Sequence, residues 1–171
     1  MSVFLSVLAC AVLVCADQLF KHLVIEYIKP IEYIDVIEGV IRFRYVENTG
    51  AVFGSFSTHT VVLTIFSVVL LIGTIVILAT NKSKSKLVNI CLLLMISGGF
   101  GNIIDRIRLH YVVDFIEPLF INFAVFNFAD CLITVGAFVL IGYLLVDLIK
   151  GTKAEQQKKK SISTEYQNES D

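Results

Sequence analysis

Two aspartates, Asp114 and Asp130, stand among apolar residues with no basic side chain beside them in the chain. Asp114 lies in the run VVDFI at 112–116, and Asp130 closes the run FNFAD at 126–130. Burial of Asp114 would raise its pKa, because desolvation disfavours a carboxylate. If the fold brings the two carboxyl groups together, both cannot ionise, and one retains a proton near neutral pH. Such a pair can activate a water molecule and protonate the amide that the water attacks. These residues therefore predict acid–base hydrolysis of a peptide bond.

Two more aspartates, Asp17 and Asp105, stand at the ends of apolar runs, and each has a structural interpretation as well. Asp17 has Lys21 at the i+4 position, which is the spacing of an ion pair within a helix. Asp105 is followed by Arg106 and Arg108. A local ion pair or an interfacial anchor would account for it.

The residues around Asp130 also have purely structural explanations. Asn127 can cap the helix that follows it, because its side-chain oxygen can accept a hydrogen bond from a free backbone N–H. Asp130 can complement the positive end of the same helix. Asn48 and Asn102 fall on the same predicted side of the membrane as these residues. The lone His22, His59 and His110 are expected to be solvated or to pack, and the outer segments offer no Ser-His, Cys-His or Ser-Lys pair with a better claim to catalysis.

The elements that position these residues must lie in a bilayer. The chain has 171 residues, of which 56% are hydrophobic and 17% charged, and its mean hydropathy is +0.80. A soluble domain of this size could not bury so much apolar surface. Intrinsic disorder requires low hydrophobicity, so the high apolar content excludes it for the chain as a whole. The net charge of −1 gives no support to nucleic-acid binding.

Four apolar runs are long enough, or nearly so, to cross the roughly 30 Å hydrocarbon core of a bilayer. They predict an all-α membrane protein with spans at about 2–20, 60–80, 87–105 and 128–149. Residues 1–150 would form one four-helix domain. The polar tail at 151–171 is rich in Lys, Gln, Ser and Glu, which predicts a disordered cytoplasmic segment. The first run could instead be a cleaved signal peptide, but it lacks a basic start.

The distribution of basic residues predicts the orientation of the chain. Eight of the 14 Lys and Arg residues lie in 82–86 and 150–160. Loops rich in Lys and Arg stay on the cytoplasmic side. Both termini are therefore expected in the cytoplasm, and the aspartates at the extracytoplasmic face of the membrane.

A small extracytoplasmic sheet is predicted between the first two spans, at about 31–56. Ile41, Phe43 and Tyr45 alternate with Arg42 and Arg44, which is the pattern of a half-buried strand. Residues 34–37 would pair with it across a turn at 38–39. The four cysteines lie in or beside the spans and have no metal-ligand spacing, so neither zinc nor a disulfide is expected.

Five ordered motifs resemble those of the bacterial lipoprotein signal peptidase family, also called signal peptidase II. They run through most of the chain, from about residue 10 to 149. In order they are DQLFK at 17–21, ENTGAVFG at 47–54, GGFGNIIDR at 98–106, VVDF at 112–115 and FNFAD at 126–130. One departure is Val52, where the family usually has Ala.

The resemblance implies an aspartyl endopeptidase that cuts prolipoproteins before a diacylglyceryl-modified Cys, with Asp114 and Asp130 as the catalytic pair. It also implies an outer β-cradle, no metal or organic cofactor, and inhibition by the cyclic peptide globomycin. Membrane lipids and the lipidated prolipoproteins would be its partners. The substrate site implied comprises Asn48, Gly50, Asn102, Arg106 and Asn127, with Asn48 a candidate for stabilising the oxyanion. Asp17, Lys21 and Asp105 would be supporting residues.

Two other classes of protein compete with a peptidase. A small ion- or proton-coupled carrier could use the aspartates as a relay, but a relay needs ionisable groups through the depth of the membrane. Residues 60–80 and 131–146 carry no charged residue and offer no such pathway. A non-catalytic scaffold would lose only stability when Asp114 or Asp130 is replaced.

Overall fold

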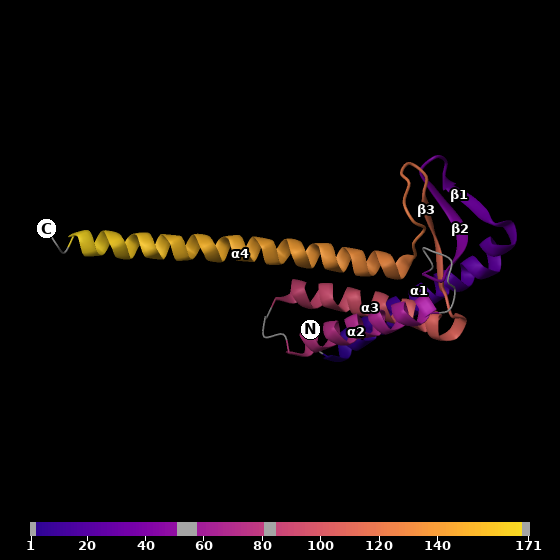
Figure 1. Cartoon of the computed structure of the whole chain (residues 1–171), viewed down its shortest axis with the longest axis horizontal. Coiled ribbons are helices and arrows are strands. Elements are labelled where there is room, and N and C mark those ends of the chain that lie inside the picture. The colour runs from indigo at the N-terminus through magenta and orange to yellow at the C-terminus, as the bar shows by residue number, and fades with distance from the viewer. Residues whose placement is uncertain (1–2, 51–57, 81–84, 169–171) are drawn as a thin grey trace.

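The computed structural model describes residues 3–50, 58–80 and 85–168, and it confirms a helical membrane fold with a small sheet (Figure 1). The helices are α1 (Val3–Leu23), α2 (Thr58–Thr80), α3 (Lys86–Leu109) and α4 (Phe128–Asn168). Four helical stretches in these ranges are long and apolar enough to cross a membrane, namely Val3–Ile31, Val61–Thr80, Lys86–Leu109 and Phe128–Lys150. They agree with the four predicted spans.

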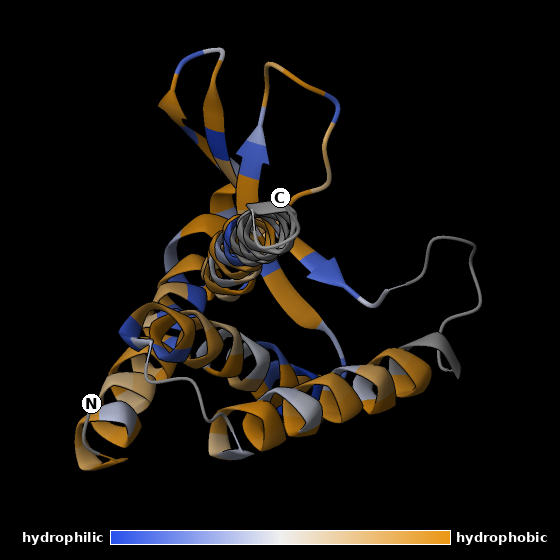
Figure 2. Ribbon diagram, turned by 90° about the vertical axis from the view of Figure 1, so that its left-hand side faces the viewer, coloured by the Kyte–Doolittle hydropathy of each residue, from blue (hydrophilic) through white to orange (hydrophobic). Residues whose placement is uncertain are grey.

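Helix α3 is the centre of the bundle, and α1, α2 and α4 each pack against it. More than half of its most apolar stretch is buried, whereas the other three spans present most of their side chains outward. Large apolar residues are therefore exposed on the outside of the helices, as expected where lipid is the solvent. The helices are hydrophobic along most of their membrane spans (Figure 2). Gly98 lets α4 pack closely against α3, because a Cβ there would collide with the carbonyl oxygen of Ala129 in α4.

The sheet has three antiparallel strands in the order β1 (Tyr33–Ile37), β2 (Ile41–Asn48) and β3 (Val112–Pro118). The first two fall within the predicted 31–56 segment. Strand β3 was not predicted, because residues 112–115 are all buried and so do not alternate. A bulge between Phe43 and Val46 shifts the register of β2 on β3. The remaining predicted positions, 51–56 with Val52, lie outside the described residues.

Helix α1 continues past its predicted end and anchors the sheet. A π-helical turn (Val24–Ile28) and a 3-10 turn (Lys29–Ile31) extend it to β1. Val24 forms a small core with Val113 and Phe115 of β3, and the Phe43 and Phe115 rings meet edge to face at 5.6 Å. The strand that carries Asp114 is thus packed directly on the end of the first span.

The polar segment after residue 150, which the sequence predicts to be a disordered tail, follows the last span. Helix α4 continues through this segment to Asn168. Residues 151–160 contain Lys, Gln, Glu and Ala, all strong helix formers, and a helix already nucleated in the span can propagate into them.

Candidate active site

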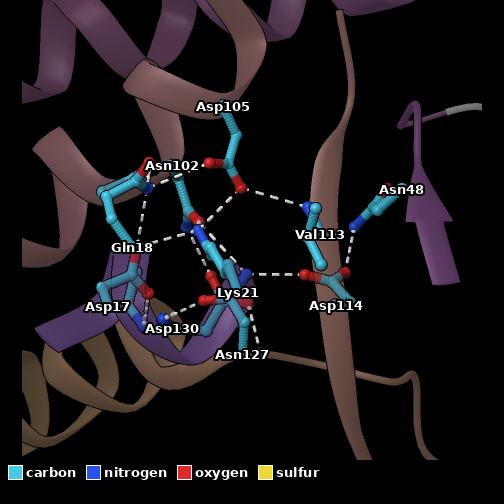
Figure 3. Close-up of polar contacts among 12 residues, drawn as sticks. Asp17, Gln18, Lys21, Asn48, Asn102, Asp105, Val113, Asp114, Asn127 and Asp130 are labelled. Atoms are coloured by element: carbon cyan, nitrogen blue, oxygen red, sulfur yellow. Dashed lines mark hydrogen bonds and ion pairs between the residues drawn. The ribbon is translucent and has the colours of Figure 1, made fainter. Parts of the chain in front are cut away.

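Asp114 and Asp130 come to one site at the sheet-bearing end of the bundle, from β3 and from the first turn of α4 (Figure 3). Two asparagine amides connect them. The Asn127 Nδ2 donates to Asp114 Oδ1 at 2.6 Å and to Asn102 Oδ1 at 3.1 Å, and the Asn102 Nδ2 donates to Asp130 Oδ1 at 2.7 Å. The sequence suggested a proton held directly between the carboxyls, whereas in this structure amide groups bridge them.

Asn127 also starts helix α4, as its cap role predicted. Its Oδ1 accepts the backbone N–H of Asp130 at 2.9 Å, and Asp130 Oδ2 accepts the backbone N–H of Asn127 at 3.2 Å. This reciprocal pair is a capping box. The cap leaves the Asn127 amide NH₂ group pointing at Asp114, so one side chain both caps the start of the helix and orients the carboxyl.

Asn48 approaches Asp114 from the other side, at the end of β2. Its Nδ2 donates to Asp114 Oδ2 at 2.8 Å. The backbone N–H of Gly50 donates to Asn48 Oδ1 at 2.9 Å and so fixes which way the amide faces. Gly50 has a φ of +73°, a left-handed conformation that glycine adopts without strain. Both residues were predicted for the substrate site, and the structure places Asn48 on Asp114 with Gly50 bonded to it.

The environment of Asp114 sets its proton affinity. The side chain is 1% exposed, and burial raises its pKa to about 6, with the nearby Asp130 charge acting in the same direction. Hydrogen bonds from Asn48 and Asn127 favour the ionised form and limit the rise. Asp114 can therefore gain or lose a proton near physiological pH.

A buried ion cluster lies behind this site and confirms the predicted pairing of Asp17 with Lys21. The Lys21 Nζ is 3.0 Å from Asp17 Oδ2, 2.9 Å from Asp105 Oδ2 and 3.1 Å from Asn102 Oδ1. The expected pairing of Asp105 with the arginines that follow it is wrong. The partner that the fold supplies is Lys21, because α1 and α3 pack side by side.

The same cluster holds the elements of the site in place. Asp17 Oδ1 accepts the backbone N–H of Ala129 in the first turn of α4 at 3.0 Å, and Asp105 Oδ2 accepts the backbone N–H of Val113 at 3.1 Å. Asp17 and Asp105 thus link α1 and α3 to the two segments that carry Asp130 and Asp114. They act as supporting residues in this structural sense.

Gln18 belongs to this cluster although no role was predicted for it. Its Nε2 lies 3.0 Å from Asp105 Oδ1 and 3.2 Å from both Asp17 Oδ2 and the carbonyl oxygen of Gly101. The available signal was a polar residue directly after Asp17 in an otherwise apolar span. Arg108 donates to Gln18 Oε1 at 3.4 Å from the outer side.

Asp130 opens on a cavity of about 290 Å³ between α2, α3 and α4. Its polar lining includes Asn102, Arg106, Ser67 and Thr74, and Gly99 adds no side chain. Arg106 Nη1 donates to Ser67 Oγ at 3.4 Å, so this predicted substrate-site residue faces the cavity from α3. Of two other cavities, the one of about 760 Å³ is mostly apolar but has Ser6 and Asn89 in its wall, and the one of about 370 Å³ is nearly entirely apolar. No carboxyl group lines either of them. Within the described ranges, no group of three or more His, Cys, Asp or Glu could hold a metal ion.

Comparisons with known proteins agree with the resemblance. The sequence profile of the signal peptidase (SPase) II family matches residues 9–146. A lipoprotein signal peptidase of Caldanaerobacter subterraneus subsp. tengcongensis is 40% identical over 143 residues, which cover 83% of this chain and 96% of the relative. One from Streptococcus thermophilus is 40% identical over 129 residues, covering 75% and 84%. A solved bacterial membrane enzyme superposes with a TM-score of 0.76 at 27% identity, over 85% of this chain and 90% of that one. The chain therefore belongs to the signal peptidase II family and is a multi-pass membrane peptidase.

Proposed function

We propose that this protein removes signal peptides from diacylglyceryl-modified prolipoproteins, cutting on the N-terminal side of the lipidated Cys, and that it does so as an aspartyl endopeptidase. The observation that carries the proposal is the convergence of Asp114 and Asp130 through two shared asparagine amides. The names of the relatives support the substrate class. The catalytic type rests on the site alone.

In this mechanism one carboxylate takes a proton from water while the other carboxyl group protonates the leaving amide nitrogen. Asp114 suits the switch between acid and base, because its pKa is raised to about 6 by burial. The amide of Asn48 lies 2.8 Å from Asp114 and is our candidate donor to the developing oxyanion. No cofactor takes part in these steps.

The place of the site suits a substrate anchored in lipid. The carboxyls lie where the spans meet the sheet, which is where the peptide bond after a membrane-spanning signal helix would arrive. The distribution of Lys and Arg supports an extracytoplasmic site with both termini in the cytoplasm. A proton carrier is disfavoured, since α2 carries no charged side chain over Thr58–Thr80.

The test uses the purified protein in liposomes with a diacylated prolipoprotein, and mass spectrometry to locate the cut. Asp114→Asn and Asp130→Asn should each abolish cleavage while the protein unfolds as cooperatively as the wild type. Asp105→Asn is the matched control, because it removes a neighbouring buried carboxylate and should cost part of the activity or stability only. The same prolipoprotein without its diacylglyceryl group should not be cut, and globomycin should block the reaction.

Full activity in Asp114→Asn or in Asp130→Asn would refute the catalytic pair. If Asp105→Asn alone were inactive, the wrong carboxyl would have been chosen. A scaffold would show no cleavage in the wild type and only stability changes in the variants.

A further inference from the structure

We propose that a group of six exposed apolar side chains beside the sheet inserts into the lipid bilayer and fixes the depth of the active site. This group, the apolar lip, comprises residues at the β1–β2 turn and residues after β3, namely Val36, Ile37, Val40, Phe120, Ile121 and Phe123. The inference concerns membrane contact and does not depend on the peptidase chemistry.

The apolar lip is exposed in the isolated chain. Phe120 is 64% exposed, Phe123 59% and Ile37 52%. Large exposed apolar groups that cluster in one place mark a contact surface on a protein. Exposure of the apolar lip to water is therefore unfavourable, and we expect an apolar contact surface to cover it.

Backbone contacts hold the two parts of the lip together. The N–H of Leu119 donates to the carbonyl oxygen of Val40 at 2.9 Å, which joins the start of the loop to the hairpin turn. At the other end, Phe126 exchanges backbone hydrogen bonds of 2.7 and 3.1 Å with Ile116 of β3. The Phe123 and Phe126 rings meet edge to face, 6.0 Å apart. The loop that carries half of the lip is therefore held to the sheet at both ends by backbone hydrogen bonds.

The loop part of the lip is uncharged, whereas the hairpin part carries Glu38 in its turn. Residues 119–128 contain no charged side chain. The strands carry their charges in ion pairs elsewhere, with Arg42 on Asp35 at 2.7 Å and Arg44 on Glu117 at 3.0 Å. An uncharged stretch with three phenylalanines in its first eight residues fits the interfacial zone of a membrane better than a polar partner surface.

The arrangement of the elements identifies lipid as the occupant. Viewed along α4, the hairpin and the loop after β3 project beyond the outline of the helices (Figure 2). From the side, this loop lies at the level where α4 begins, on the face of the sheet nearer the bundle (Figure 1). Since α4 starts its membrane span at Phe128, the lip lies over lipid at the boundary of the hydrocarbon core.

This position has a consequence for the site. The loop of the lip connects Pro118, the last residue of β3, to Phe128, the first residue of α4. Asp114 lies on one of these elements and Asp130 on the other. Inserting the loop between them would hold both carboxyls at one depth in the membrane.

The experiment exploits the absence of tryptophan from the chain. Phe120→Trp is reconstituted into vesicles of phosphatidylcholine and phosphatidylglycerol, with and without acyl chains brominated near the headgroup. Tyr33→Trp is the matched control, because Tyr33 is 46% exposed and is the first residue of β1. Strand β1 starts on the side of the sheet that faces away from α4 (Figure 1). Thermal unfolding verifies that both variants fold, and Ile121→Trp replaces Phe120→Trp if that variant does not.

We expect brominated lipid to quench Phe120→Trp about twofold or more strongly than Tyr33→Trp, and aqueous iodide to show the opposite order. Equal quenching of both by iodide, with no effect of brominated lipid, would overturn the proposal. So would a solvent-like emission of Phe120→Trp in plain vesicles that shifts only when lipidated substrate is added, because the lip would then be a substrate surface. Neither readout uses cleavage, so failure here is distinct from failure of the proposed function.

Discussion

Replacing Lys21 with methionine tests how much the buried ion cluster contributes to stability. The Lys21 Nζ lies within 3.1 Å of Asp17, Asp105 and Asn102, and its side chain is 3% exposed. Methionine retains much of the length and apolar volume of lysine but removes the charge. Two buried carboxylates would then face one another without their cation.

Removing one partner of a buried ion pair costs about 3–5 kcal/mol, because the remaining charge is left uncompensated. We expect Lys21→Met to lose stability in this range. For a chain of this size the loss corresponds to a fall in Tm on the order of 10 °C. Thermal unfolding of the purified protein in detergent, followed by circular dichroism, measures it.

Lys29→Met is the matched control. Lys29 pairs with Glu47 at 3.2 Å, but the two side chains are 47% and 45% exposed. Such a pair is worth less than about 1 kcal/mol. The triple variant Asp17→Asn, Lys21→Met, Asp105→Asn should regain most of the loss, since it removes the unpaired charges and keeps acceptors for the Ala129 and Val113 N–H groups. If Lys21→Met cost no more than Lys29→Met, the reasoning from burial would be refuted.

Two further predictions concern Asp114 and its amide partner. The free energy of unfolding should fall by about 3 kcal/mol as the pH rises from roughly 4 to 6. The pKa of Asp114 is about 6 in the folded state and near 3.9 in the unfolded state. In this pH range the folded state therefore holds a proton that the unfolded state has released. Asp114→Asn should flatten this part of a Tm-against-pH curve, and an unchanged slope would contradict the assignment. Asn127→Ala should lose the helix cap, worth about 1 kcal/mol, together with activity. Asn127→Ser should retain most of the cap stability but lose activity with the amide bridge, and a fully active Asn127→Ser would show that the bridge is dispensable.

The spans could be predicted from the sequence because each is a local property of one apolar run. Strand β2 could be predicted for a similar reason, since Ile41, Phe43 and Tyr45 alternate with charged residues. Strand β3 could not, because it is packed on both faces by elements from distant parts of the chain, and period-2 alternation disappears when both faces are buried.

The site was predictable in its residues but not in its connections. Asp114 and Asp130 stood out because each lacked a neighbouring cation in an apolar run. Asp105 was misinterpreted for the opposite reason, since two arginines follow it in the chain and its buried partner, Lys21, is distant in sequence. Which amide bridges which carboxyl depends on how α3, β3 and α4 meet, and no local pattern encodes that.

The charge balance at this end of the bundle explains why a proton belongs to the site. Asp17, Asp105, Asp114 and Asp130 gather here, and among the described residues Lys21 and Arg106 are the cations that line the two parts of the site. Full ionisation of these six groups would leave two net negative charges in a largely buried cluster. All three N–H groups of Lys21 are already directed at Asp17, Asp105 and Asn102. The described contacts thus give Asp114 neutral amide donors only, from Asn48 and Asn127. Protonating Asp114 halves the excess charge. The cluster that links the four elements therefore also favours the acid form of Asp114 that the proposed mechanism requires.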